Sequence, residues 1–375
     1  MASTASLRVL KPVRIDREIA VFELGEGWVA VSNCFGAGVL EPRYLVMASV
    51  SECGEDLDVL YEAVARRAGV DRSESVIMIT ALPIAPSLRV AVKDVDGTRV
   101  EMVMTAGFEP VACVDYDTVY ENLRGTINIA IAIDDVLSVS ALLDAFRTVV
   151  ESKAAASADL GLRCTSRAVG TVTDAIAVFG RKGEHGIALC GIATKLGNAI
   201  AKIVRDSLVS AFTESADLDE LLRHALGLGL DELVELAMRV YREAPVPGVD
   251  ESRVRSMIRA RIVRMLEDPN VWSFIIASRE LDLRGSVGTL WRLPREEFAS
   301  DSTRIVADEI LGISLALYVA GFRGLFTLFW VERLKRRVGG LRKIASLPMF
   351  EDDIASALIA SALTLVYNEL LGTAP

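Results

Sequence analysis

Two pairs of adjacent acidic residues stand in otherwise apolar segments near the end of this 375-residue chain. Asp308 and Glu309 lie in "RIVADEILGISLALYVAG", and Asp352 and Asp353 lie in "LPMFEDDIASALIASALTLVY". The second pair falls in the first turn of a predicted helix, where capping alone explains acids. The first pair is expected some turns into a helix, so at least one of its carboxylates faces the core. Because clustered, buried carboxylates need a compensating cation, we expect a divalent ion on oxygen ligands, such as Mg²⁺.

A second group of polar residues interrupts runs of small and β-branched residues in the first half. A single strand over residues 168–180 would place Thr171 and Thr173 on one face and Asp174 on the other. Burying such groups without partners costs about 1–3 kcal/mol each, so they face one another or a ligand. Paired hydroxyls and solvated charges are the alternative. The group comprises Asn128 in "GTINIAIAID", Glu151 and Lys153 in "VVESKAAAS", and Thr171, Thr173 and Asp174 in "AVGTVTDAIAVFG".

The charge and the cysteine pattern exclude several classes of partner and site. A formal net charge of −10 with 41 scattered basic residues would repel a nucleic-acid backbone, so no nucleic-acid partner is expected. Two histidines are too few for a histidine-rich zinc site within one chain. Five cysteines without a CxxC spacing predict reduced thiols, no disulfide and a cytoplasmic protein. Arginine outnumbers lysine and glutamine is absent, which favours a thermophile.

The sequence shows no clear membrane anchor. Its start, "MASTASLRVLKPVRIDREIA", lacks the continuous apolar run of a signal peptide. The most apolar later run, residues 310–322, is shorter than the roughly 20 apolar residues that cross a bilayer. No stable membrane insertion is therefore expected, and the sequence leaves homo-oligomerisation open.

Apolar periodicity divides the chain into two parts. Between residues 18 and about 135, short runs such as "REIAVFEL" and "RVEMVMTAG" are separated by Gly, Pro, Asn and Asp, which predicts strands. Helical spacing follows in "SVSALLDAFRTVVESK" and in "TKLGNAIAKIVRDSL". After residue 213 the segments are helical. We therefore expect an α+β domain at residues 1–213, with a mixed sheet and helices, and an all-α domain at residues 214–375.

Four motifs of the first half resemble the adenosylcobinamide amidohydrolase family. They are "GTINI", "TVVESKAAA", "GTVTDA" and "GIATKLG", in this order, and Thr148, Glu151 and Lys153 stand at the matching helix positions. The resemblance extends over residues 18–212. It implies hydrolysis of the amide that joins aminopropanol to adenosylcobinamide, a corrinoid, to give adenosylcobyric acid.

Physical chemistry assigns roles to the polar residues of this first part. Amide hydrolysis needs a general base, a proton donor for the amine and a donor to the developing oxyanion. Glu151 or Asp174 is our candidate base. Cys34, in a Gly-flanked loop, is an alternative nucleophile, although a buried inert thiol is its more ordinary role. The candidate donors are Lys153, Asn128, Thr171 and Thr173.

The acid pairs of the second half resemble a different family. "DSTRIVADEILG" and "MFEDDIASALIAS" look like segments of the α-ribazole phosphatase branch of the phosphatidylglycerophosphatase A superfamily, and the likeness covers residues 228–371. It implies a phosphomonoester substrate, either α-ribazole 5′-phosphate or adenosylcobalamin 5′-phosphate. The implied metal ligands, for Mg²⁺ or another divalent cation, are Asp308, Glu309, Asp352 and Asp353. Additional candidates are Asp268 and Asn270 in "DPNV". Arg323 and Lys335 are candidate phosphate ligands, and solvated surface bases are the equal alternative for both. "LKRRVGGL" departs from the family, where Lys-Pro-Gly is expected.

Together the two halves predict a bifunctional hydrolase of cobalamin biosynthesis and corrinoid salvage that acts on small molecules. One alternative is a non-enzymatic corrinoid-binding or scaffold protein whose acids only cap helices. Another is a phosphatase joined to an amidase of different specificity.

Overall fold

The chain folds into two compact units. The computed structural model describes residues 4–51, 56–115, 126–300 and 304–373. One unit covers Met1–Ser215 and the other covers Ala216–Pro375. The first contains mixed sheets with helices and the second is mainly helical, which confirms the expected character of both parts.

The described strands of the first unit form three sheets. A six-stranded sheet has the order β4-β3-β12-β10-β8-β7, a four-stranded sheet has the order β1-β2-β5-β6, and β9 pairs with β11. The pairs β10–β12 and β5–β6 are parallel, and the other pairs are antiparallel. The strands are β1 (Lys11–Ile15), β2 (Ile19–Glu23), β3 (Trp28–Ser32), β4 (Gly38–Leu40), β5 (Tyr44–Ser49), β6 (Ser75–Thr80), β7 (Arg89–Val95), β8 (Thr98–Ala106), β9 (Val111–Cys113), β10 (Ile127–Val136), β11 (Ala168–Thr171) and β12 (Ala175–Arg181).

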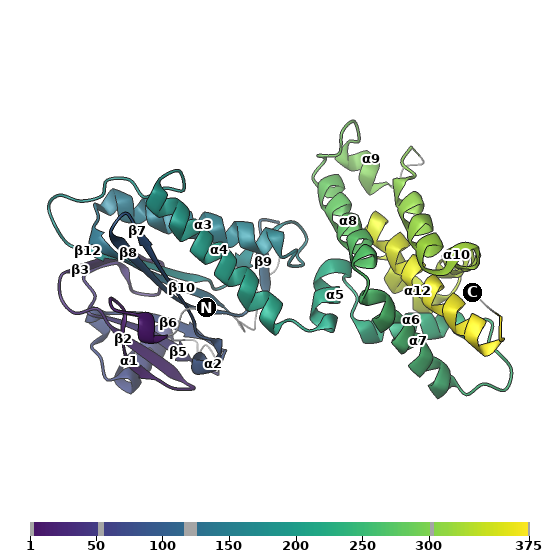
Figure 1. Ribbon diagram of the computed structural model, residues 1–375, viewed down its shortest axis with the longest axis horizontal. Coiled ribbons are helices and arrows are strands. Elements are labelled where there is room, and N and C mark those ends of the chain that lie inside the picture. Colours follow the sequence, from purple (N-terminus) through teal and green to yellow (C-terminus); the bar gives the residue numbers. More distant parts are fainter. Residues whose placement is uncertain (1–3, 52–55, 116–125, 301–303, 374–375) are drawn as a thin grey trace. The chain divides into compact units, whose positions relative to one another are not determined.

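The two larger sheets pack against each other between helices (Figure 1). Helices α3 (Val139–Asp159) and α4 (Lys195–Ser215) lie on the six-stranded sheet, and α1 (Leu57–Ala68) packs on the four-stranded sheet. Because β10 is covered on both faces, its first seven residues are all buried and, apart from Asn128, apolar. The short elements are η1 (Thr4–Ser6), η2 (Arg72–Glu74) and α2 (Ile84–Ser87).

The strand expected over residues 168–180 is wrong in one respect, because it is two strands in different sheets. β11 ends at Thr171 and pairs with β9, whereas β12 begins at Ala175 and lies between β10 and β3. The chain turns between them, so Thr173 and Asp174 lie in the turn and not on opposite faces of a strand. The backbone amide of Thr171 donates to Asp174 Oδ2 at 3.0 Å and closes this turn.

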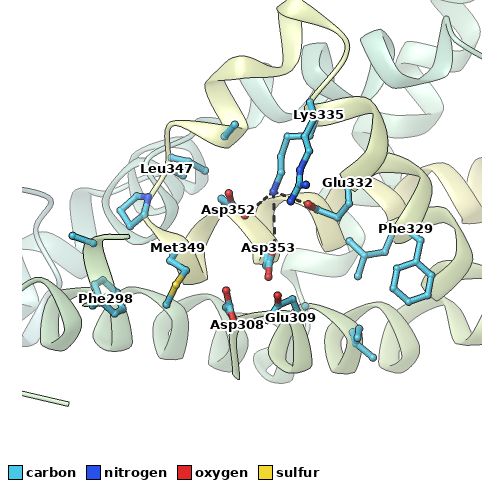
Figure 2. A pocket seen from close by; sticks show the side chains of 17 residues that line it. Phe298, Asp308, Glu309, Phe329, Glu332, Lys335, Leu347, Met349, Asp352 and Asp353 are labelled. Atoms are coloured by element: carbon cyan, nitrogen blue, oxygen red, sulfur yellow. Dashed lines mark hydrogen bonds and ion pairs between the residues drawn. The ribbon is translucent and has the colours of Figure 1, made fainter. Parts of the chain in front are cut away.

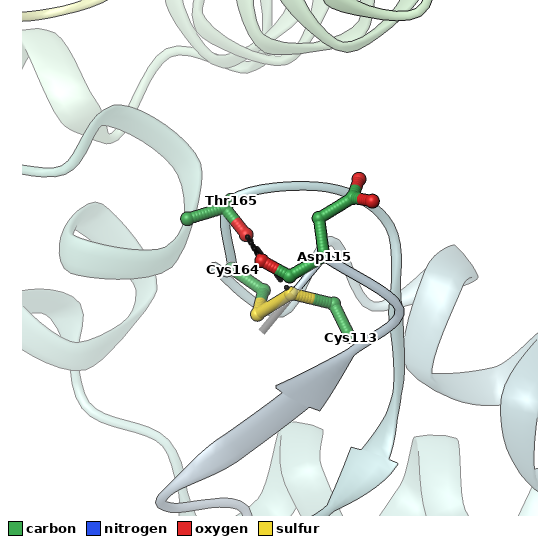
Figure 3. Close-up of a disulfide and its surroundings, with 4 residues drawn as sticks. All are labelled: Cys113, Asp115, Cys164 and Thr165. Atoms are coloured by element: carbon green, nitrogen blue, oxygen red, sulfur yellow. Dashed lines mark hydrogen bonds between the residues drawn. A yellow bond between two sulfur atoms is a disulfide. The ribbon is translucent and has the colours of Figure 1, made fainter. Parts of the chain in front are cut away.

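The expectation that all cysteines are reduced is also wrong. Cys113 and Cys164 form a disulfide with their Cα atoms 6.1 Å apart, and the Thr165 hydroxyl beside it donates to the Asp115 carbonyl at 3.2 Å (Figure 3). The pairing of β9 with β11 brings these segments together across 51 residues of sequence. Cys34 and Cys190 are free and buried, and Cys53 lies outside the described residues.

The second unit packs its helices around α12 (Figure 1). Most side chains of α12 from Phe350 to Val366 are buried, because α6, α7, α8 and α10 all contact this helix. The helices are α5 (Leu218–Leu226), α6 (Leu230–Tyr241), α7 (Glu251–Leu266), α8 (Pro269–Ser286), α9 (Arg295–Ala299), α10 (Ala307–Lys335), η3 (Gly339–Leu341), α11 (Arg342–Ala345) and α12 (Met349–Leu370).

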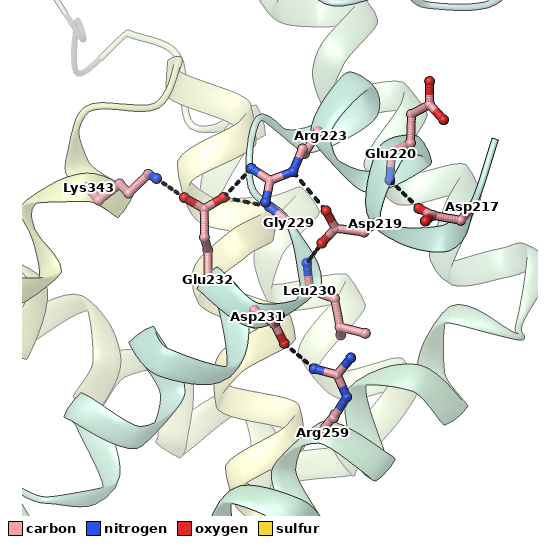
Figure 4. Close-up of polar contacts among 10 residues, drawn as sticks. All are labelled: Asp217, Asp219, Glu220, Arg223, Gly229, Leu230, Asp231, Glu232, Arg259 and Lys343. Atoms are coloured by element: carbon pink, nitrogen blue, oxygen red, sulfur yellow. Dashed lines mark hydrogen bonds and ion pairs between the residues drawn. The ribbon is translucent and has the colours of Figure 1, made fainter. Parts of the chain in front are cut away.

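A polar network fixes the turn between α5 and α6 (Figure 4). Arg223 of α5 donates to Asp219 at 2.8 Å and to Glu232 of α6 at 2.9 Å. Asp219 also accepts from the Leu230 amide at 2.7 Å, and Lys343 forms an ion pair with Glu232. The contact with Asp219 satisfies the Leu230 amide, one of the free amides at the start of α6.

Helix α10 is a hairpin of two arms and not one straight rod. Asp308 near its start and Lys335 at its end line the same cavity, whereas a straight helix of 29 residues would separate its ends by about 40 Å. The reversal occurs at Gly321, where φ is 61° and ψ is −158°. By length and composition alone, α10 is the one described helix that qualifies as a membrane span. Each arm is only about 20 Å long, short of the roughly 30 Å hydrocarbon core of a bilayer.

We predict that Gly321→Ala destabilises the protein by about 1–3 kcal/mol, because only glycine readily adopts this backbone conformation. Gly339→Ala is the matched control, since both glycines have open space where a Cβ would stand and only Gly321 has a positive φ. Chemical denaturation of both variants measures the difference. Equal effects of the two substitutions would contradict the hairpin geometry.

Candidate active sites

The first cluster of polar side chains lies where β10 and β12 begin. We call Thr126, Lys153, Thr171, Thr173 and Asp174 the lysine–aspartate cluster. Lys153 reaches it from α3 and forms an ion pair with Asp174, and their side chains are only 10% and 7% exposed. The hydroxyls of Thr126 and Thr173 are hydrogen-bonded to each other.

Asp174 is the centre of this cluster, because four donors of the described chain converge on its carboxylate. They are the Lys153 ammonium, the Thr171 hydroxyl, the Thr171 amide at 3.0 Å and the Ile127 amide at 3.2 Å. A carboxylate offers about four acceptor positions. Asp174 is therefore saturated, and accepting a further proton would require one of these donors to leave.

Gly170 allows the ion pair to lie against the backbone. A Cβ at this position would collide with Asp174 Oδ2 and with the Lys153 ammonium, and its φ is +145°. The glycine of the "GTVTDA" motif is thus needed both for its conformation and for its missing side chain.

Asn33 ties the Asp174 turn to the end of β3. Its side-chain amide donates to the Asp174 carbonyl at 2.9 Å and accepts from the Ile176 amide at 2.7 Å. The neighbouring Cys34 is buried, and burial raises the pKa of its thiol to about 11. A thiol that stays protonated at neutral pH is a poor nucleophile, so the ordinary structural role of Cys34 fits the site better.

Asn128 lies fully buried on β10, between the two packed sheets. Its side-chain amide donates to the Ile79 carbonyl at 3.1 Å and to the Thr105 hydroxyl at 3.3 Å. Its Oδ1 atom has no hydrogen-bond partner among the described residues. The structure thus gives Asn128 a role in joining β10 to the facing sheet.

The structure does not bring Glu151 into the lysine–aspartate cluster. Its side chain is 45% exposed and forms an ion pair with Arg147 at 3.6 Å, one turn back on α3. The buried Thr148 of the same motif donates to the Cys190 carbonyl at 3.3 Å, which holds the segment that precedes α4. The polar residues of the "TVVESKAAA" motif therefore do not share one site. Lys153 reaches the lysine–aspartate cluster, Glu151 pairs with Arg147 outside it, and Thr148 contacts the segment before α4.

The second candidate site is a cavity of about 670 Å³ in the helical unit (Figure 2). Carboxylate oxygens of Asp308, Glu309 and Asp353 lie within 4.8 Å of one another, and those of Glu332, Asp352 and Asp353 form a second such group. Both arms of α10 and the start of α12 contribute these side chains. The structure thus brings together all four predicted metal ligands.

Lys335 lies among these acids, as expected of a site residue. Its ammonium is 2.7 Å from Glu332, 2.8 Å from Asp352 and 3.8 Å from Asp353. Glu332 was not predicted. Its position three residues before Lys335 is the one signal in the sequence, and that spacing is common in solvated ion pairs.

One expectation about the acids is wrong, because α10 begins at Ala307 and Asp308 and Glu309 lie in its first turn. A capping role does not account for Asp308, however. Asp308 is 4% exposed, and its Oδ1 has no hydrogen-bond partner in the described chain. Glu332 Oε1 is likewise buried without a partner. Orphaned carboxylate oxygens in an all-oxygen donor set fit a hard divalent cation.

The acids of this cavity hold their protons unusually tightly. Burial, reinforced by Glu309, raises the pKa of Asp308 to about 7. Burial and the adjacent Asp352 raise the pKa of Asp353 to about 9. Burial lowers the pKa of Lys335, but Asp352 and Glu332 more than offset this, so the pKa is raised overall.

The described lining of this cavity does not include three of the predicted site residues, which are Asp268, Asn270 and Arg323. Asp268 caps α8 by accepting from the Asn270 amide at 2.8 Å, and it also accepts from the Tyr318 hydroxyl at 2.9 Å. Arg323 donates to Asn368 at 2.7 Å. These contacts join α8 and α12 to the middle of α10.

Two buried groups that support the cavity had no signal in the sequence. Asp282 of α8 accepts from the amides of Phe350 and Glu351 at 3.0 and 2.9 Å, and so caps α12 from a neighbouring helix. Burial raises the pKa of Asp282 to about 7. Arg279 forms a buried ion pair with Glu351 at 3.4 Å. Together they fix the helix end that carries Asp352 and Asp353.

The family model for adenosylcobinamide amidohydrolase matches residues 5–220. The chain belongs to the adenosylcobinamide amidohydrolase family. Its matched region contains the whole lysine–aspartate cluster, so the first unit is the amidohydrolase unit and the resemblance seen in the four motifs is confirmed.

Other comparisons give more distant likenesses. An uncharacterised protein of Methanocaldococcus jannaschii is 25% identical over 119 residues, which are 32% of this chain and 90% of that protein. The low temperature requirement C protein of Listeria monocytogenes is 21% identical with a TM-score of 0.35, covering 41% of this chain and 94% of that one. A protein of unknown function from Bacillus stearothermophilus is 20% identical with a TM-score of 0.34, covering 42% and 98%.

We predict that the metal-free protein loses stability as the pH rises from 5 to 8.5. An Asp whose pKa is higher in the folded than in the unfolded chain binds its proton more tightly when folded. Stability therefore falls as the pH rises above the unfolded value near 4 and through the raised values of Asp308 and Asp353, by up to about 1.4 kcal/mol per pH unit and group. Thermal denaturation with a chelator measures the slope.

Asp353→Asn should flatten this slope, and added Mg²⁺ should raise the melting temperature most at the alkaline end. A stability that is flat or rises over this interval, or an unchanged slope in Asp353→Asn, would contradict the assignment of these pKa values.

Proposed function

We propose that the amidohydrolase unit cleaves the aminopropanol amide of adenosylcobinamide at the lysine–aspartate cluster and releases adenosylcobyric acid. Membership of the family supports hydrolysis in corrinoid salvage. The observation that carries the site is the buried ion pair of Lys153 and Asp174 beside hydroxyl groups. Burying an ammonium group is unfavourable for folding, so a role in the reaction would explain why a lysine occupies this position.

In this proposal Lys153 donates to the oxygen that becomes an oxyanion when the amide carbonyl is attacked. Asp174 holds the ammonium and the Thr171 hydroxyl in place. When the ammonium turns to the substrate oxygen, one acceptor position of Asp174 becomes available, and its carboxylate acts as the candidate general base for the attacking water. The Thr173 hydroxyl is the remaining candidate donor, because the side-chain amide of Asn128 already donates to Ile79 and Thr105. Glu151 is the other candidate base, placed on a separate face of α3.

We predict that Lys153→Ala lowers kcat for aminopropanol release from adenosylcobinamide by about 10²–10³-fold with a small change in KM, as for other oxyanion donors. Lys182→Ala is the matched control, because Lys182 forms an exposed surface ion pair with Glu41. Chromatographic detection of aminopropanol is the assay. An activity of Lys153→Ala within a few-fold of wild type would rule out this role.

Asp174→Asn and Glu151→Gln separate the two candidate bases. Because the structure places Glu151 outside the cluster, we expect Asp174→Asn to lose activity as Lys153→Ala does and Glu151→Gln to lose less than tenfold. The opposite order would assign the base to Glu151.

For the helical unit we propose a metal-dependent phosphatase that removes phosphate from α-ribazole 5′-phosphate or adenosylcobalamin 5′-phosphate. Asp308, Glu309 and Asp353 would hold Mg²⁺ or another divalent cation. Two observations carry this proposal: Oδ1 of Asp308 is buried without a partner among the described residues, and a carboxylate oxygen of Asp308 lies within 4.8 Å of oxygens of Glu309 and Asp353. When bound, such an ion polarises the phosphoryl group and lowers the pKa of a bound water.

The chain's own residues have separate tasks in this reaction. Asp352 and Glu332 hold Lys335 in the cavity, and its ammonium offers a charge for phosphate oxygens. Arg336 lines the same cavity and adds a second cation. Leu328, Phe329 and Met349 line it as apolar walls that limit the access of water.

We predict that phosphate release from α-ribazole 5′-phosphate requires added Mg²⁺ and falls at least 100-fold in Asp353→Asn. Asp231→Asn is the matched control, because Asp231 forms an exposed ion pair with Arg259 in the same unit. Phosphate release that continues in the presence of a chelator would favour a helical unit whose acids have only a structural role. Equal rates of phosphate release in Asp353→Asn and Asp231→Asn would favour the same conclusion.

A further inference from the structure

The carboxylates of the acidic cavity form two groups that share one residue. Asp308 and Glu309 make up the first group with Asp353, and Glu332 and Asp352 make up the second group with the same Asp353. Within each group the carboxylate oxygens lie within 4.8 Å of one another. The two oxygens of one carboxylate can each contact a different cation, and enzymes that hold two metal ions place them about 3.5–4 Å apart. The cavity therefore has two adjacent positions for a cation.

Lys335 fills the second of these positions (Figure 2). Its ammonium nitrogen lies 2.7 Å from Glu332, 2.8 Å from Asp352 and 3.8 Å from Asp353. The side chain is only 7% exposed. An ammonium group offers three donors, which matches the three carboxylates of this group. The second position thus holds a cation that belongs to the chain itself.

The first position differs, because a buried oxygen there lacks a partner. Oδ1 of Asp308 has no hydrogen-bond partner among the described residues, and Asp308 is 4% exposed. Glu309 is exposed, so an ion bound beside it would keep part of its hydration shell, as Mg²⁺ usually does. The first position suits a hard divalent cation. The second position is closed to such an ion while the ammonium occupies it.

We propose that the Lys335 ammonium takes the place of a second metal ion, and that the helical unit therefore binds one divalent cation, at Asp308, Glu309 and Asp353. This inference rests on the metal site of the phosphatase proposed above and goes beyond it, because it fixes the number of ions and gives a reason for a lysine among buried acids. Because Asp353 belongs to both groups, the ammonium and the bound ion lie next to each other, where both attract the same phosphoryl group.

The test counts the ions that the metal-free, full-length protein binds when it is titrated with Mn²⁺. Electron paramagnetic resonance measures the free ion, and its difference from the total gives the bound ion. We expect one Mn²⁺ per chain in wild type. We expect two in Lys335→Met, with magnetic coupling between them, because removal of the ammonium leaves the second group of carboxylates open to an ion.

Three further variants control for charge and place. Lys343→Met should bind one Mn²⁺, because Lys343 is paired with Glu232 of the same unit and is not in the described lining of the cavity. Lys335→Arg keeps the positive charge and should also bind one. Lys335→Met combined with Glu332→Gln should return to one, because the second position then loses a carboxylate.

Two ions in wild type, or a single ion in folded Lys335→Met, would overturn the proposal. A second ion that the double variant retains would overturn it too, since that ion would lie elsewhere. Circular dichroism shows whether Lys335→Met is folded. If it is not, wild type and Lys335→Arg decide, and two ions in either of them would contradict the proposal.

Phosphate release from the same preparations separates this inference from the phosphatase proposal. If wild type binds one Mn²⁺ and releases no phosphate from any phosphomonoester, the phosphatase proposal fails and the assignment of Lys335 stands. If wild type releases phosphate and binds two Mn²⁺, the phosphatase proposal stands and this inference fails. Wild type that binds no Mn²⁺ also overturns this inference.

Discussion

The ion pair between Lys153 and Asp174 is the interaction on which the first unit's site depends. Four donors on one carboxylate require the chain to turn sharply after Thr171, and the closeness of the pair to the backbone requires glycine at position 170. The same turn separates β11 from β12 and sends them into different sheets. Loss of Asp174 would leave a buried ammonium without its counter-ion, a change that typically destabilises by several kcal/mol.

The helical unit presents the opposite electrostatic problem, an excess of carboxylates. Among the described residues, five acids and two basic residues line its larger cavity, so this part of the lining carries 2 − 5 = −3 charges when all are ionised. Protons relieve part of this repulsion, as the raised pKa values of Asp308 and Asp353 indicate. A divalent cation would relieve it at neutral pH and would also meet the orphaned oxygen of Asp308. The reversal at Gly321 makes this assembly possible, because it brings the two ends of α10 together.

Hydrophobic periodicity was sufficient to predict most strands and helices, since burial on one or both faces leaves a direct pattern in the sequence. It was not sufficient where distant contacts override local preference. "TVTD" has the composition of a strand, and only the donors that converge on Asp174 turn the chain there. Cys113 and Cys164 meet only after two short strands pair. Glu332 joins the other acids only because α10 folds back, and no local pattern shows that reversal.

The most direct test measures aminopropanol release and phosphate release on the same preparations of two variants. The account predicts that Lys153→Ala loses the first activity and keeps the second, and that Asp353→Asn does the reverse, because each unit has its own core and its own charged site. Variants that lose both activities together, or neither, would contradict two separate sites in one chain.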